Sequence, residues 1–290
     1  MLLHYFLMLS LVVISALTSV LTKLSAETIN ATTFLFWRYL IALFAMIGYA
    51  LIRQIKIDRG SLWFGLKLSL VIFPGLWLNY QALTLINASL LSFITGLSIL
   101  VVFALQLYQA RKAPLWKDIL IIGLSLTSLG LVTLQSVSGE KWGIYYGLLA
   151  TISYGLYFVL IGKRKGENLA VIHMGYLLGC VATSLIIGSG GIVISLPQQA
   201  NTWLIIGFTA LVYSVAGSIL QYWLQPKLGT LHTSILFTFR PMLIILMEAL
   251  FLGNTLPPYV YSAGILMVIC VGWMQVQVHT GKHLHAQDNP

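Results

Sequence analysis

The stretch NYQALTLINASLLSFITGLSIL, residues 79–100, has a counterpart later in the chain, QYWLQPKLGTLHTSILFTFRPM, residues 221–242. A shift of 142 residues places Tyr80 on Tyr222. Three further pairs match at this offset: Ser92 with Ser234, Gly130 with Gly272, and Gln135 with Gln277. Each match is weak alone, but one constant offset close to half the chain predicts two homologous halves.

The composition indicates an integral membrane protein. Of 290 residues, 59% are hydrophobic and only 8% are charged, whereas soluble domains carry about 25% charged residues. The net charge of +9 lies in short basic runs between apolar segments, so the expected partner is the lipid bilayer and not nucleic acid. Cys180 and Cys270 both fall inside apolar segments, which predicts neither a disulfide framework nor a metal site. No cofactor is expected.

A helix needs about 20 apolar residues to cross the hydrocarbon core of a bilayer. Ten segments meet this length: 5–23, 32–52, 61–82, 88–110, 116–136, 143–162, 170–195, 202–224, 230–252 and 258–277. We therefore predict a first five-helix repeat over 1–137, a second over 138–278 and a polar tail over 279–290.

The distribution of Lys and Arg predicts the orientation. Eleven basic residues lie in the even-numbered loops and the tail, against two, Lys23 and Lys141, in the odd-numbered loops. By the positive-inside rule, both termini are cytoplasmic. Five spans per half is an odd number, so the second half enters the membrane from the opposite side. The predicted fold is an all-α membrane protein of ten transmembrane helices in two inverted-topology repeats, an architecture typical of transporters that work by alternating access.

The order and spacing of several motifs resemble one family. The motifs are TKL (22–24), FWRYLIA (36–42), ALTLINASLLSFITGLS (82–98), Gly123 and Gly130, ISYGLYFVLIGKR (152–164), LFLG (250–253) and AGILMVICVG (263–272). Over nearly its whole length the chain resembles the EamA-type transporters of the drug/metabolite transporter superfamily. It departs from their pattern at Ile99, where Pro is frequent, at Asn254, where Glu is common, and at Arg240, where Glu or Ser is usual.

Polar side chains inside a membrane span should face the protein interior or a wet cavity. Ser15, Thr18, Ser19 and Thr22 follow the i, i+3, i+4, i+7 pattern, which places them on one helix face. That face lines either a substrate cavity or a helix interface. In GYLLG (175–179) the small-xxx-small pattern predicts close helix packing.

The ninth segment carries three unusual residues. Arg240 lies near its middle, where a charge costs at least about 2.5–3.5 kcal/mol, and Thr233 and Glu248 share its polar side. Pro241 cannot donate to the carbonyl of Phe237, which predicts a kink and a hinge. Arg240 is interpreted as the group that attracts a substrate carboxylate, with a structural charge as the alternative.

Two further sets of residues are predicted to take part in gating or in substrate binding. Arg38 in the second segment and Glu248 lie at similar depths and could form an extracellular gate, although Arg38 could instead snorkel to the interface. Aromatic and amide side chains in the third, sixth and eighth segments could stack on a substrate or donate hydrogen bonds, with core packing as the alternative. They are Trp77, Asn79, Tyr80, Tyr157, Gln221 and Tyr222.

These features predict a secondary active transporter of small polar metabolites in a bacterial inner membrane. Arg240 favours a carboxylate, and Glu248 and the aromatic rings favour an amine, so amino acids or related amines are the expected substrates. Quaternary amines or drugs are the alternative. In the resembled family movement is often outward, which makes export one expected direction; coupling to a proton gradient and the choice between monomer and homodimer stay open. A membrane-embedded enzyme is disfavoured, because the chain has no HExxH, no GxSxG and no close carboxylate pair.

Overall fold

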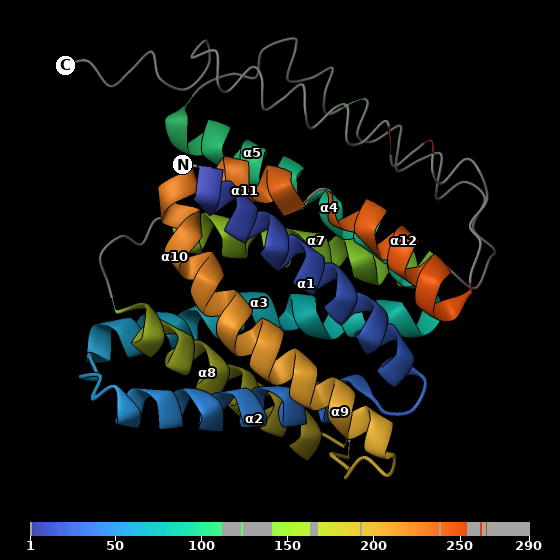
Figure 1. Cartoon of the computed structure of the whole chain (residues 1–290), viewed down its shortest axis with the longest axis horizontal. Helices are drawn as coiled ribbons and strands as arrows, with labels where there is room; N and C mark the ends of the chain where they lie inside the picture. Colours follow the sequence, from blue (N-terminus) through green and yellow to red (C-terminus); the bar gives the residue numbers. More distant parts are fainter. Residues whose placement is uncertain are drawn as a thin grey trace.

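The computed structural model describes residues 2–111, 123, 141–162, 168–191, 193–237, 239–253, 262 and 265, and the elements within them are helices joined by turns and short connections. The elements are α1 (Leu2–Ala26), α2 (Ala31–Ile52), α3 (Arg59–Leu85), α4 (Ala88–Gly96), α5 (Ser98–Ala110), α7 (Lys141–Gly162), α8 (Leu169–Ser189), α9 (Ala200–Phe208), the π-helix η2 (Thr209–Gly217), α10 (Ser218–Leu228), α11 (Thr230–Phe237) and α12 (Arg240–Leu252). Figure 1 shows α9, η2 and α10 as one continuous rod that crosses the bundle beside α1.

This is an all-helical membrane protein. In the described residues, seven helices are long and apolar enough to span a bilayer. Eight of the ten predicted segments are helical. The predicted spans 116–136 and 258–277, apart from isolated positions, and the predicted tail 279–290 lie outside the described residues.

The helix bounds repeat at the offset found in the sequence. Shifted by 142 residues, α3 falls on 201–227, α4 on 230–238 and α5 on 240–252. Within one residue, these are the bounds of the α9–η2–α10 rod, of α11 and of α12. The break between α4 and α5 therefore recurs between α11 and α12. In the second copy the expected kink is a full interruption, and Pro241 sits in the first turn of α12, where its missing N–H costs nothing.

Glycines bring α3 and α8 into backbone contact. A Cβ on Gly175 would lie 2.2 Å from the carbonyl oxygen of Leu62, and one on Gly65 would lie 2.0 Å from that of Ile172. Both distances are too short for any side chain, so the two helices need glycine where they cross. The interpretation of GYLLG as a packing motif is confirmed at Gly175.

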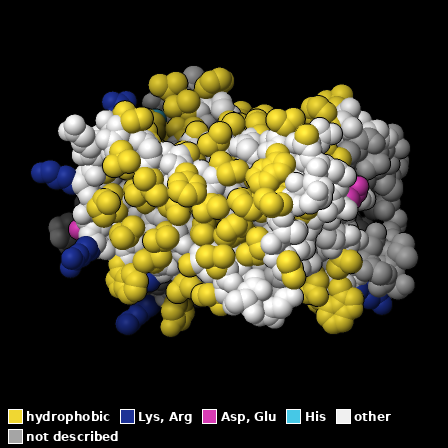
Figure 2. Space-filling model, turned by 90° about the horizontal axis from the view of Figure 1, so that it is seen from below, with side chains coloured by type: hydrophobic (Ala, Val, Ile, Leu, Met, Phe, Trp, Pro, Cys, Tyr) yellow, Lys and Arg dark blue, Asp and Glu magenta, His cyan; other side chains and the backbone are white. Residues whose placement is uncertain are grey.

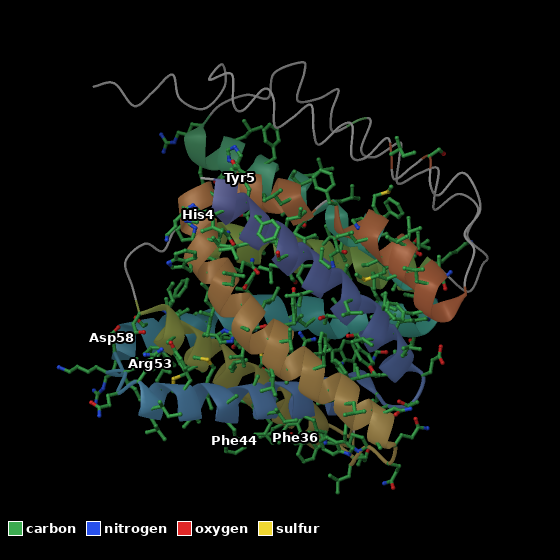
Figure 3. The ribbon with its side chains drawn as sticks, viewed as in Figure 1. His4, Tyr5, Phe36, Phe44, Arg53 and Asp58 are labelled. Carbon is green, nitrogen blue, oxygen red and sulfur yellow. The ribbon has the colours of Figure 1, made fainter. Side chains whose placement is uncertain are left out.

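The surface separates a lipid-facing band from polar ends. Figure 2 shows a face dominated by hydrophobic side chains, with most of the visible Lys and Arg at one end. In Figure 3, Phe36 and Phe44 point away from the bundle on α2, and Arg53 and Asp58 lie at the turn into α3, toward the same end as His4. The chain start and the first basic loop thus share one side of the molecule.

Candidate functional site

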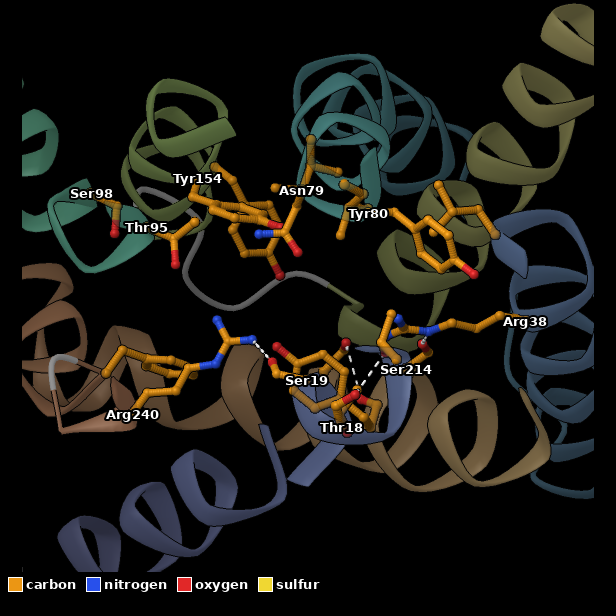
Figure 4. A pocket seen from close by; sticks show the side chains of 18 of the residues that line it. Thr18, Ser19, Arg38, Asn79, Tyr80, Thr95, Ser98, Tyr154, Ser214 and Arg240 are labelled. Carbon is orange, nitrogen blue, oxygen red and sulfur yellow. Dashed lines mark hydrogen bonds between the residues drawn. The ribbon is translucent and has the colours of Figure 1, made fainter. Parts of the chain in front are cut away.

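A cavity of about 120 Å³ lies at the centre of the bundle, between the two repeats (Figure 4). One water needs about 10–15 Å³ on the same measure, so the space suits a small metabolite. Its wall draws on helices from both repeats: α1 to α5 in the first, and α7, α8, η2, α10, α11 and α12 in the second. The polar and aromatic lining residues are Thr18, Ser19, Thr22, Phe34, Arg38, Tyr39, Asn79, Tyr80, Ser92, Thr95, Ser98, Tyr154, Tyr157, Phe158, Tyr176, Tyr213, Ser214, Ser218, Gln221, Phe237 and Arg240.

Arg240 reaches the cavity because the helix is interrupted there. The amide N–H of Phe239 donates to the carbonyl of Leu236 at 3.2 Å, which closes a tight turn before α12 begins at Arg240. Its guanidinium Nη2 donates to the hydroxyl of Ser19 on α1. Within the described residues, the buried Nε–H of Arg240 has no hydrogen-bond partner. A buried donor without a partner is costly, so the side chain has a free donor for an acceptor that the described residues do not supply.

The hydroxyl face of α1 is buried, and most of it faces the cavity. Thr18, Ser19 and Thr22 line the space, whereas Ser15 is fully buried outside it. Thr22 donates to the carbonyl of Thr18 at 2.7 Å, which leaves its oxygen free to accept. Both interpretations of this face therefore apply to different parts of it: Thr18, Ser19 and Thr22 line the cavity, and Ser15 lies in a helix interface.

Arg38 also lines the cavity, from the opposite side. It is only 5% exposed, and its Nε–H donates to the hydroxyl of Ser214 in η2 at 2.8 Å. Its guanidinium carbon lies 5.4 Å from the ring centre of Tyr39 and 5.5 Å from that of Tyr213, within cation–π range. Neutral hydroxyl and ring partners hold the charge in place without neutralising it.

Glu248 has a different environment from the one predicted. Its two carboxylate oxygens accept the backbone N–H groups of Ala88 at 3.0 Å and Ser89 at 3.2 Å. The carboxylate caps the N-terminus of α4, where Asn87 makes no side-chain cap. The structure therefore does not bring Glu248 to Arg38, and Glu248 is not among the residues that line the cavity.

The predicted aromatic and amide residues divide into two groups. Asn79, Tyr80, Tyr157 and Gln221 line the cavity. Trp77 and Tyr222 are not among the lining residues: the indole N–H of Trp77 donates to the hydroxyl of Thr32, and Tyr222 lies against His173. The predicted residues Thr233 and Pro241 are buried and do not line the cavity either.

Several lining residues were not predicted. They are chiefly tyrosines and small hydroxyl residues: Tyr39, Tyr154, Tyr176, Tyr213, Ser92, Thr95, Ser98 and Ser214. Ser98 could have been found from the repeat, because the 142-residue offset places it on Arg240. Tyr213 and Ser214 belong to the π-helix η2, whose i→i+5 hydrogen bonds place side chains on different faces from those that the α-helical period predicts. In the described part of the chain, no three His, Cys, Asp or Glu side chains are grouped to hold a metal ion.

Comparisons with known proteins identify both halves of the chain. The model of the EamA-like transporter family matches residues 2–134 and, separately, residues 141–274. No curated protein matches the sequence. One solved structure, described only as the crystal structure of a protein, is similar with a TM-score of 0.68 over 97% of this chain and 98% of its own. The sequence identity is 14%, so this likeness concerns the fold alone.

Proposed function

The chain belongs to the EamA-like transporter family, and we propose that it moves amino acids or related small metabolites that carry a carboxylate, with the central cavity as the binding site. The family match makes it a multi-pass membrane transporter and not an enzyme. A small-molecule substrate follows from that membership, and its chemical class is the content of the proposal.

The observation that carries the proposal is the state of Arg240. A guanidinium presents a planar fork of N–H donors that matches a carboxylate. Among the described residues, Arg240 donates to the hydroxyl of Ser19, and its buried Nε–H has no partner. A substrate carboxylate would satisfy that donor and offset the cost of a charge at membrane depth.

Transport proceeds, in this proposal, by alternating access around the cavity. The support is the repetition of helix bounds at 142 residues, together with the two interrupted helices that flank the site. Ten spans in two inverted repeats, with both termini in the cytoplasm of a bacterial cell, would let the repeats exchange conformations. The shared position of His4 and Arg53 at one end in Figure 3 is consistent with that orientation.

Quaternary amines and drugs are a weaker second candidate. Tyrosine and phenylalanine rings in the cavity wall could hold a cation. Two arginines share that wall, however, and the lining residues in the described part of the chain include no Asp or Glu. A cationic substrate would therefore meet repulsion from Arg38 and Arg240, and the described wall offers no acid to offset it.

Purified protein provides the test. Amino acids, other carboxylates and amines are screened for a rise in melting temperature, and the hits are followed by flux into and out of proteoliposomes with and without a pH gradient. We expect carboxylate-bearing compounds to stabilise the wild type, and Arg240→Gln to lose that effect while Arg53→Gln, an exposed loop arginine, keeps it. Stabilisation by amines alone, or equal responses of Arg240→Gln and the wild type, would refute the proposal.

A further inference from the structure

Two arginines face one cavity from opposite repeats. Arg38 comes from α2 and Arg240 from α12. Figure 4 shows the two side chains pointing toward one another, with Ser19 and Ser214 at their respective head groups and Asn79 and Tyr154 above the space between them. An arginine has five N–H donors, and the hydrogen bonds found for these two use one donor each.

The positive charge of the cavity has no counterpart in its described wall. No Asp or Glu is among the lining residues, and the carboxylate of Glu248 is already occupied by the amides of α4. The partners of Arg38 are a hydroxyl and aromatic rings, all neutral. A buried charge without an opposite charge is strongly unfavourable, so within the described wall the two guanidiniums call for two negative charges and not for one.

We propose that the substrate carries two carboxylates, as an acidic amino acid or another small dicarboxylate does, with one carboxylate on Arg240 and the other on Arg38. This inference rests on the proposed function and narrows its substrate class. The hydroxyls of Ser19 and Ser214 position the two guanidiniums, and Asn79 and Tyr154 contact the carbon chain or an amino group between them. Arg38 is thereby assigned to substrate binding, in place of the two roles considered from the sequence, a gate with Glu248 or snorkelling to the interface.

The test compares pairs of probes that differ in one carboxylate: glutamate with glutamine, and glutarate with butyrate. Binding to the purified wild-type protein is measured by calorimetry or thermal shift. A second charge-assisted, bidentate contact should tighten apparent binding about 10- to 100-fold, so glutamate and glutarate should exceed their partners by that factor. Arg38→Gln should abolish the preference while still binding the singly charged probes.

Arg38→Lys is the matched variant, because it keeps the charge and loses the planar fork; part of the preference should remain. The wild-type comparison needs no variant, so it decides the question even if Arg38→Gln does not fold. Glutamine bound and transported as well as glutamate would overturn the two-carboxylate inference and leave the proposed function standing. No binding of any carboxylate would overturn both.

Discussion

Glu248 allows a stability prediction with a magnitude set by the structure. Its carboxylate is 2% exposed and accepts two buried amides at 3.0 and 3.2 Å. Glu248→Ala would leave the N–H groups of Ala88 and Ser89 without an acceptor, at about 1–3 kcal/mol for each buried donor. The expected loss is roughly 2–6 kcal/mol. Glu248→Gln keeps one carbonyl acceptor and should lose about half as much.

Thermal unfolding in detergent measures the loss. At about 2–4 °C per kcal/mol, Glu248→Ala should melt at least about 4 °C below the wild type, with Glu248→Gln between them. Glu27 is an exposed carboxylate near the end of α1, so Glu27→Ala is the matched control and should change stability by less than about 0.5 kcal/mol. If Glu248→Ala melted with the control, the capping role would be wrong.

Three other changes have defined outcomes. Gly175→Ala places a Cβ against the α3 backbone and should cost about 1–3 kcal/mol in unfolding free energy, whereas Gly48→Ala, with open space at its Cβ, should not destabilise. Hydrogen bonds from Ser61 hold the pKa of the Asp58 carboxyl below its ordinary value; the melting advantage of the wild type over Asp58→Ala should therefore be complete at pH 7 and shrink below about pH 4. Lys23→Met removes the ammonium that caps two carbonyls at the end of α3 and should lower the melting temperature, which an unchanged melting curve would contradict.

The hydrophobic segments were predictable because a membrane span imposes a length and a composition that few other structures share. The break at Pro241 was also visible, since proline removes a backbone donor wherever it occurs. The matching break after Gly96 has no proline, and the sequence alone predicts one continuous helix over 88–110. Its position became clear once α4 and α11 could be compared.

Residue partners were harder to predict. The spacing placed Arg240 and Glu248 on one side of the same helix, but it could not show that an interruption turns Arg240 into the cavity while Glu248 caps a helix of the other repeat. Similar depth suggested that Arg38 meets Glu248, yet the hydroxyl of Ser214 lies nearer in the fold. Depth along a helix follows from the sequence, whereas the rotation of one helix against another depends on packing.

In the proposed mechanism, the cavity lies on a route that opens alternately to the two sides of the membrane. Asn79 lines the cavity, so Asn79→Cys is introduced into a variant in which Cys180 and Cys270 are both replaced by Ala. Membrane-impermeant thiol reagents are then applied from either side of sealed vesicles. Phe44→Cys, on the outer face of α2, is the control. We predict that Asn79→Cys is labelled from both sides and protected by bound substrate, whereas Phe44→Cys, which faces the lipid, is labelled from neither side. Labelling from one side only under every condition would contradict alternating access.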